Sequence, residues 1–252
     1  LIEPSFGCNL KCGHCCAELI PEEQKTDTTL DTKTRADLMS YKTWCSTFKI
    51  LNEVSPTVRV DLCGFVGEPT LHPNLTEWLS IARELAPLAQ IQITTNGTML
   101  RKGKVNYKSL LDAGANIIYT DQYGPNAEFE KLAKLSKYPF YQYYDKPKDV
   151  PSPWKYYGPH LKMIVLMTPP QKWPKSRFNA NLLGNWYGNL NWDKGKRFGM
   201  KPLNKPLKRR CNQPFLHVTV AANGNYLLCC QDGMHTFDGM FENVSEGVEG
   251  FR

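Results

Sequence analysis

Three cysteines near the start of the chain are the residues best suited to chemistry. They are Cys8, Cys12 and Cys15, spaced C-x3-C-x2-C in the segment FGCNLKCGHCC. Cysteine thiolates are the usual ligands of iron–sulfur clusters. Three of them on one short loop can bind three irons of a four-iron cluster and leave the fourth iron open. Because an open iron can bind a reactant, the spacing predicts a catalytic cluster.

A zinc site is the alternative interpretation of the same loop. Zinc takes four nitrogen or sulfur ligands, and His14 or Cys16 could provide the fourth. Structural zinc sites usually combine two separated ligand pairs, and no matching second pair follows nearby in the sequence. The spacing therefore favours an iron–sulfur cluster, with Cys16 as a bystander.

Polar residues also follow three predicted strands further along the chain. An Asn-Gly pair or a Gly-Glu-Pro sequence is by itself an ordinary turn or helix start. In parallel strands, however, such residues meet at one edge of the sheet, where α/β proteins bind their ligands. The three groups are Gly67-Glu68-Pro69, Thr94-Thr95-Asn96-Gly97 and Asp121-Gln122.

The order of these motifs resembles that of the radical S-adenosylmethionine (radical SAM) enzymes. The resemblance implies that Cys8, Cys12 and Cys15 hold a [4Fe-4S] cluster and take part in catalysis. In that family the open iron chelates S-adenosylmethionine. An electron from the cluster then releases a 5′-deoxyadenosyl radical, which takes a hydrogen atom from the substrate.

The resemblance also assigns cofactor-binding residues. Gly67, Glu68 and Pro69 match the last three residues of the family's Gly-Gly-Glu-Pro motif, which holds the amino group of S-adenosylmethionine; Val66 replaces the first glycine. A charged glutamate would be a strong acceptor for an ammonium group.

Two further positions follow from the same resemblance. Thr95 and Asn96 belong to a Thr-Asn-Gly sequence that lines the cofactor pocket in the family. Asp121 and Gln122 fall where related enzymes present polar groups to the ribose or the substrate. If the substrate is dehydrogenated, a deprotonating group is needed, and Asp121 is the candidate.

A second group of cysteines lies near the end of the sequence. Cys211, Gly224 and Cys229 form a C-x12-G-x4-C pattern that resembles the start of the SPASM appendage, which binds auxiliary iron–sulfur clusters. The thiols present allow one auxiliary cluster at most. Neighbouring side chains on a strand point to opposite faces, so we expect Cys211 and Cys229 as ligands and leave Cys230 open. A hairpin whose thiols pack in the core is the alternative.

Predicted strands and helices alternate along the chain, which indicates βαβ units and a parallel sheet. About six such units would form a partial (β/α)6 TIM-like barrel over residues 1–205. A small iron–sulfur appendage with a β-hairpin would follow over residues 206–252. The predicted strands span 1–5, 57–65, 90–97, 116–121, 139–145 and 160–167, and the predicted helices span 36–52, 73–85, 109–115 and 127–137.

Composition limits the classes of protein. The 252 residues are 41% hydrophobic, enough for one buried core, and no apolar run approaches the roughly 18 residues of a membrane span. Nine clustered cysteines favour reduced, metal-binding thiols over a secreted disulfide framework, so we expect a cytoplasmic protein. The basic residues of segment 194–210 indicate a solvated connector, although such a run can also attract nucleic acid.

The sequence thus predicts a radical SAM enzyme that oxidises, cross-links or otherwise modifies a peptide or a small molecule. Such an enzyme would need a low-potential electron donor such as flavodoxin or ferredoxin. The positive net charge of +7 keeps a nucleotide- or RNA-modifying enzyme as an alternative. A non-catalytic zinc-binding module is the third interpretation.

Overall fold

The structure is a computed structural model that describes residues 1–10, 12, 37–63, 67–143, 155–167, 217–227 and 242–247. Cys15, Cys211, Cys229 and Cys230 lie outside these ranges. So does the predicted boundary between residues 205 and 206.

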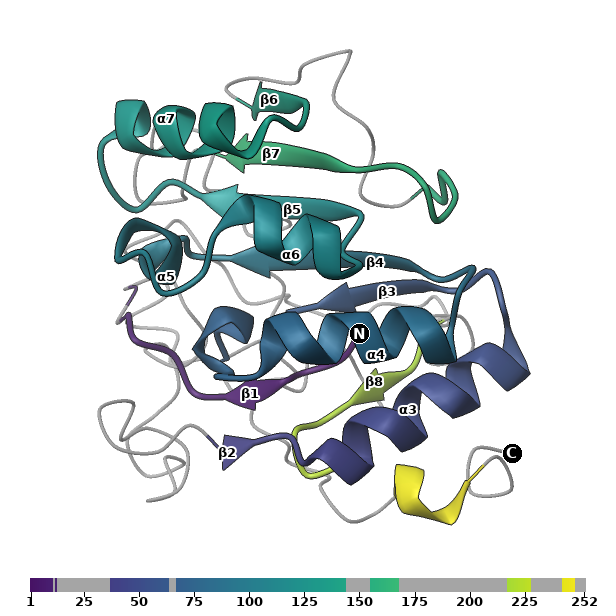
Figure 1. Ribbon diagram of the computed structural model, residues 1–252. Helices are drawn as coiled ribbons and strands as arrows, with labels where there is room; N and C mark the ends of the chain where they lie inside the picture. Colours follow the sequence, from purple (N-terminus) through teal and green to yellow (C-terminus); the bar gives the residue numbers. More distant parts are fainter. Residues whose placement is uncertain are drawn as a thin grey trace, which may run out of the picture.

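A five-stranded parallel sheet forms the centre of the molecule (Figure 1). Its strand order is β3-β4-β5-β7-β6, so the last two strands exchange places relative to their order in the chain. The parallel α/β sheet predicted from the alternation of strands and helices is confirmed. The strands are β3 (Arg59–Leu62), β4 (Gln90–Thr95), β5 (Ile117–Asp121), β6 (Phe140–Tyr143) and β7 (Met163–Met167).

The start of the chain runs beside β3. The N–H of Ile2 donates to the carbonyl of Asp61 at 2.9 Å, and the N–H of Cys63 donates to the carbonyl of Ile2 at 3.2 Å. The chain then enters β1 (Ser5–Phe6), which pairs antiparallel with β2 (Asp37–Leu38). The residues that precede the cysteine loop are thereby anchored to the sheet.

Helices cover one face of the sheet and bury its main core. Leu79 of α4, Leu110 of α6 and Phe129 of α7 are all fully buried in one cluster with Ile91 and Ile118 of the sheet. The helices are α3 (Tyr41–Val54), α4 (Leu75–Leu85), α5 (Thr98–Arg101), α6 (Tyr107–Ala113) and α7 (Asn126–Ser136).

The first helix begins later than the sequence suggested. Leu38, expected on its apolar face, belongs to β2 and is exposed. The Ser40 side chain accepts a hydrogen bond from the N–H of Thr43, so it caps the helix and sets its start. Trp44 and Phe48 are fully buried, as predicted for the apolar face.

The other face of the sheet carries different side chains. Ile117 and Tyr119 of β5 pack there with Met163 and Val165 of β7 in a separate buried cluster. Successive residues of a strand alternate between faces. Asp121, two residues after Tyr119, therefore lies on this face, opposite α4, α6 and α7, at the carboxyl end of β5.

A β-hairpin near the end of the chain was also predicted, and it is present. Strands β8 (Thr219–Val220) and β9 (Tyr226–Leu227) pair antiparallel. Gly224 has φ of +91° in the turn between them, a conformation that glycine adopts readily. Val220 also exchanges backbone hydrogen bonds with Leu1 and Glu3, so the hairpin is joined to the N-terminal segment.

The helices that the structure describes include none with the length and apolar character needed to cross a membrane.

Candidate functional site

Parallel pairing places three of the sequence motifs at one edge of the sheet. Leu62 of β3 pairs with Ile93 of β4, and Thr95 of β4 pairs with Thr120 of β5. Each strand therefore ends at nearly the same level. The turn at Gly67-Glu68-Pro69, the Asn96-Gly97 turn and Asp121 all follow these ends.

Glu68 joins two of these motifs through its carboxylate. One oxygen, Oε1, accepts from the N–H of Thr70 at 3.0 Å, from the Thr70 hydroxyl at 2.5 Å and from the Thr95 hydroxyl at 2.6 Å. The other, Oε2, accepts from the N–H of Asn96 at 2.7 Å. The side chain is only 2% exposed. Glu68 thus fixes the turn after β3 against the end of β4, and only Oε2 retains capacity for a further donor.

Burial raises the pKa of Glu68, and its hydrogen bonds oppose that shift. The donors from Asn96, Thr70 and Thr95 all favour the ionised form. Both oxygens of a carboxylate can accept these hydrogen bonds, whereas an amide has only one accepting oxygen. Glutamate therefore suits this position better than glutamine.

Asn96 extends the connection to the cysteine loop. Its Nδ2 donates to the Sγ of Cys8 at 3.4 Å and to Oδ1 of Asn9 at 2.9 Å. Its Oδ1 accepts from the N–H of Thr98 at 2.9 Å, at the start of α5. A hydrogen bond to a thiolate sulfur is one of the contacts that tune an iron–sulfur cluster.

Backbone contacts hold the segment that precedes Cys8 against the same turn. The N–H of Glu68 donates to the carbonyl of Gly7 at 2.9 Å, and the Ser5 hydroxyl donates to the carbonyl of Glu68 at 2.6 Å. Gly7 has φ of +134°, which favours glycine and turns the chain immediately before Cys8.

Cys8 and Cys12 are suitable cluster ligands in their chemistry and their exposure. Neither cysteine forms a disulfide with another described residue, and both are partly exposed rather than packed in the core. The described residues include no group of three His, Cys, Asp or Glu side chains arranged to hold a metal ion. The third predicted ligand, Cys15, lies outside them. The donor atoms present fit an iron–sulfur cluster.

Asp121 lies on the sheet face opposite α4, α6 and α7, close enough to Glu68 for the two charges to interact. Most of the surface of this residue is buried, although some of it stays exposed. Burial raises its pKa to about 7, and the nearby charge of Glu68 adds to the shift. A carboxylate of this kind can hold or accept a proton near neutral pH.

The remaining predicted residues have structural contacts of their own. Pro69 opens the short helix η2 (Pro69–Leu71), for which Glu68 is the cap. The hydroxyl of Thr95 accepts from the N–H of Gly97 at 3.1 Å in addition to bonding Glu68. Gln122 is fully buried. Its predicted contact with the ribose or the substrate stays a prediction.

Two contributing residues were not predicted. Ser5 bonds the backbone of Glu68, and Thr70 donates twice to its carboxylate. A threonine two residues after an acidic cap position is a local capping signal that could have indicated Thr70. Ser5 carries no such signal, because its partner is 63 residues away.

A family model described as the Radical SAM superfamily matches residues 2–149, more than half of the chain. No curated protein sequence matches the chain.

Solved structures with a similar fold include two of BtrN. A crystal structure of BtrN in complex with AdoMet and 2-DOIA has a TM-score of 0.60 and 20% sequence identity, covering 97% of this chain and 77% of BtrN. A structure of selenomethionine BtrN in an open conformation has a TM-score of 0.51 and 18% identity, covering 98% of this chain and 76% of BtrN. At this identity the likeness establishes the fold alone.

Proposed function

Because the chain belongs to the radical SAM superfamily, whose members cleave S-adenosylmethionine at an iron–sulfur cluster, we propose that it oxidises a C–H bond of a polar small molecule or a peptide. Cys8, Cys12 and Cys15 would hold the [4Fe-4S] cluster. The cluster and S-adenosylmethionine would together supply the radical that removes a hydrogen atom.

One observation carries this proposal: a continuous set of hydrogen bonds joins Glu68, Asn96 and Cys8. These residues come from three motifs that are distant in the sequence, and the fold brings them into direct contact. Glu68 positions Asn96, and Asn96 in turn contacts the first predicted cluster ligand. An accidental turn after each strand would have no reason to produce this connection.

Asp121 is the proposed acceptor of the proton that the oxidation releases. Oxidation of a CH–OH group to C=O removes one hydrogen atom, one proton and one electron. The hydrogen atom would end in 5′-deoxyadenosine and the proton on the Asp121 carboxylate. The electron would pass to an auxiliary iron–sulfur cluster, for which Cys211 and Cys229 are the proposed ligands, with Cys230 as a third thiol beside them. The crystal structure of BtrN with AdoMet and a second ligand supports this proposal, because the similar fold there holds the two molecules together.

The test is cleavage of S-adenosylmethionine by anaerobically reconstituted protein reduced with dithionite. We expect 5′-deoxyadenosine and methionine as products, and about four irons and four sulfides at the N-terminal site. Cys12→Ala should abolish cleavage and remove the iron of that site. Cys45→Ala, on α3 and outside the site, is the matched control and should retain both.

Two results would reject the proposal. If Cys12→Ala still cleaves S-adenosylmethionine, the Cys12 thiolate is not required for the reaction. Stoichiometric zinc without iron or sulfide would instead support the structural metal module.

A further inference from the structure

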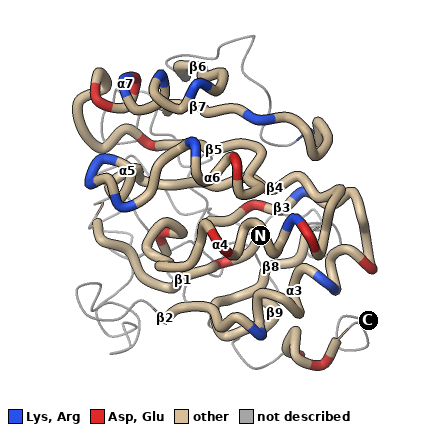
Figure 2. The backbone as a smooth tube through the Cα atoms, viewed as in Figure 1, with Lys and Arg blue, Asp and Glu red and all other residues tan. Residues whose placement is uncertain are grey.

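Helices α5, α6 and α7, together with the residues that directly follow α5 and α7, carry a group of basic side chains that the proposed chemistry does not use. Figure 2 shows these charges along α5 and α7 and at the start of α6. All seven residues are exposed. We call this surface the α5–α7 basic face; it consists of Arg101, Lys102, Lys104, Lys108, Lys131, Lys134 and Lys137.

Most of this positive charge is not compensated locally. Arg101 pairs with Glu128 at 2.6 Å, and Lys108 pairs with Asp112. Within the part of the chain that the structure describes, none of the other five lysines of the face has a carboxylate within ion-pair distance. The face therefore attracts negatively charged molecules.

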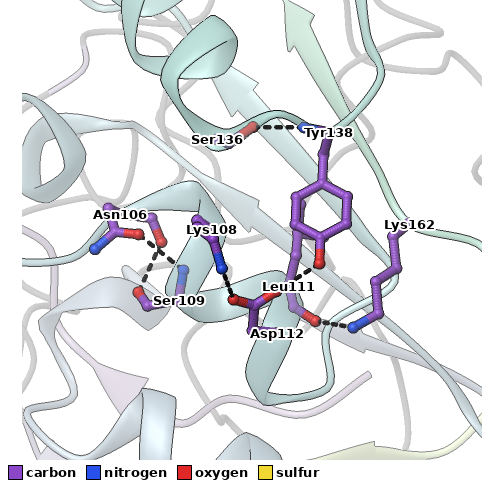
Figure 3. A network of polar contacts seen from close by, with 8 residues as sticks. All are labelled: Asn106, Lys108, Ser109, Leu111, Asp112, Ser136, Tyr138 and Lys162. Atoms are coloured by element: carbon purple, nitrogen blue, oxygen red, sulfur yellow. Dashed lines mark hydrogen bonds and ion pairs between the residues drawn. The ribbon is translucent and has the colours of Figure 1, made fainter.

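Lys108 belongs to a network of polar contacts around Asp112 (Figure 3). The Asp112 carboxylate accepts from Lys108 and from the hydroxyl of Tyr138, and these two bonds hold the pKa of Asp112 below its usual range. Lys162 donates to the carbonyl of Leu111. Asp112 therefore stays ionised and offsets the charge of Lys108, which leaves the five unpaired lysines as the source of the attraction.

An apolar hollow lies among the basic residues, between α6 and α7. It has a volume of about 210 Å³ and is lined by Leu100, Leu132 and Leu135 together with polar side chains. Leu135 is 66% exposed. The hollow is smaller than the 300–1,000 Å³ of typical small-molecule sites, but it could receive one side chain of a protein partner.

The face is connected to the cysteine loop by a short path. Asn96 donates to the Sγ of Cys8 at 3.4 Å and accepts from the N–H of Thr98, the first residue of α5. Lys102 follows Thr98 by four residues, about one helical turn. A partner bound over α5 would approach the protein on the side of Cys8.

We propose that the α5–α7 basic face docks an acidic, low-potential electron-carrier protein, which delivers electrons toward the Cys8 loop. This inference rests on the proposed function, because only a redox site needs such a partner. Charge complementarity steers the partner to the face, and the hollow between α6 and α7 anchors one apolar side chain of it.

RNA is the other polyanion that a basic face could bind. The apolar part of this face consists of leucines, whereas single-stranded RNA is held by stacking on exposed aromatic rings. The observations therefore favour a protein partner.

The experiment compares two reductants on the same holoenzyme. One is reduced flavodoxin, an acidic electron carrier, and the other is dithionite, which needs no docking surface. The variant Lys102→Glu/Lys104→Glu/Lys134→Glu reverses three charges of the face. Lys49→Glu is the matched control, because Lys49 is exposed on α3, which lies beside α4 and away from α7 (Figure 1). Flavodoxin binding is measured separately by titration calorimetry.

We expect the triple variant to require roughly tenfold more flavodoxin for half-maximal cleavage and to bind it correspondingly more weakly. Its dithionite-driven rate should stay within about twofold of the wild type. Raising the ionic strength from about 0.01 M to about 0.15 M, which shortens the Debye length from about 30 Å to about 8 Å, should remove most of the difference.

Equal flavodoxin binding by the wild type, the triple variant and Lys49→Glu would overturn the docking proposal. So would binding of a single-stranded RNA that is lost in the triple variant while flavodoxin binding is unchanged. A wild type that is inactive with dithionite would reject the proposed function instead, and the calorimetric titration would still decide whether the face binds the carrier.

Discussion

At the scale of single residues, Glu68 is the central side chain of the site. It is buried, its carboxylate accepts four hydrogen bonds, and its backbone bonds the segment before Cys8. A charged group can be buried in this way only when donors surround it. Its first role is therefore to position the turns around the cofactor site, and contact with the cofactor's amino group remains open to Oε2.

Glu68→Gln tests this positioning role. The amide of glutamine would point two N–H groups at neighbours that are themselves donors, which leaves buried polar groups unsatisfied. We expect a loss of about 2–4 kcal/mol in the free energy of unfolding, measured by denaturant titration of the metal-free protein. Glu84→Gln, at an exposed site on α4, should change it by less than about 0.5 kcal/mol. Equal stability of the two variants would contradict the role of Glu68.

Asp121 makes a prediction about pH. Its pKa is raised from 3.8 to about 7, so the folded protein holds a proton that the unfolded chain releases near pH 4. The folded state then binds more protons between these values, and its stability falls as the pH rises from about 4 to about 7. Asp121→Asn should remove a decline on the order of 1–3 kcal/mol across this window, measured by unfolding titrations at several pH values.

Two comparisons control this result. Asp112, whose pKa is lowered by Lys108 and Tyr138, contributes stability that is lost as the pH falls, so Asp112→Asn should change the pH slope in the opposite direction. If Asp121 accepts the substrate proton, turnover should also rise through about pH 7 and be lost in Asp121→Asn, while cleavage of S-adenosylmethionine without substrate persists. A pH profile of stability identical to the wild type would show that Asp121 titrates normally.

At the scale of elements, the turn between β4 and α5 sets the position of Asn96. Gly97 has φ of +72°, and a Cβ at this position would lie 2.5 Å from Phe129 of α7 and 2.8 Å from Thr120 of β5. Both neighbours are fully buried and cannot move aside easily. The turn can therefore approach α7 only with glycine at this position.

Gly97→Ala should displace α7 or the turn and lower stability by about 2–4 kcal/mol, from strain and overpacking together. Gly103→Ala is a close control, because Gly103 also has positive φ, +65°, but no atom within 4 Å of its Cβ position. That variant should cost only about 1 kcal/mol. Similar losses in the two variants would show that backbone strain alone, and not the contact with Phe129, constrains the turn.

At the scale of the whole molecule, Asn116 joins several parts of the fold at the edge of the sheet opposite the site. Its Oδ1 accepts from Arg83 of α4 at 2.8 Å and from the N–H of Ile91 at 2.7 Å. Its Nδ2 donates to the carbonyls of Pro159 at 2.7 Å and Leu161 at 2.9 Å. One side chain thus holds α4, β4 and the segment before β7 together.

Asn116→Ala should lower the free energy of unfolding by about 2–4 kcal/mol, because it leaves buried donors and acceptors without partners. Asn74→Ala is the matched control: Asn74 is exposed and makes no side-chain capping bond to α4. Thermal unfolding of the metal-free proteins measures both. An Asn116 variant as stable as the wild type would mean that the connection contributes nothing to the fold.

The sequence by itself determined the alternation of strands and helices, and with it the parallel sheet. Apolar β-branched runs such as those around Ile91 and Ile118 form buried strands in almost any α/β context, because their pattern is local. The start of α3 was placed too early, since Leu38 fitted the helical spacing while Ser40 caps the helix. Local patterns also do not specify which strands become neighbours, so they could not predict the exchange of β6 and β7.

The motif order in the sequence likewise determined the family, because Cys8, Glu68 and Asn96 occur in local signatures that do not depend on the rest of the chain. Only the tertiary structure decided what these side chains do to one another. It directs the donors of Thr70, Thr95 and Asn96 to the Glu68 carboxylate and places Asp121 on the sheet face opposite α4, α6 and α7. Hydrogen bonds and pKa shifts of this kind depend on distances between residues far apart in the chain, and packing alone sets those distances.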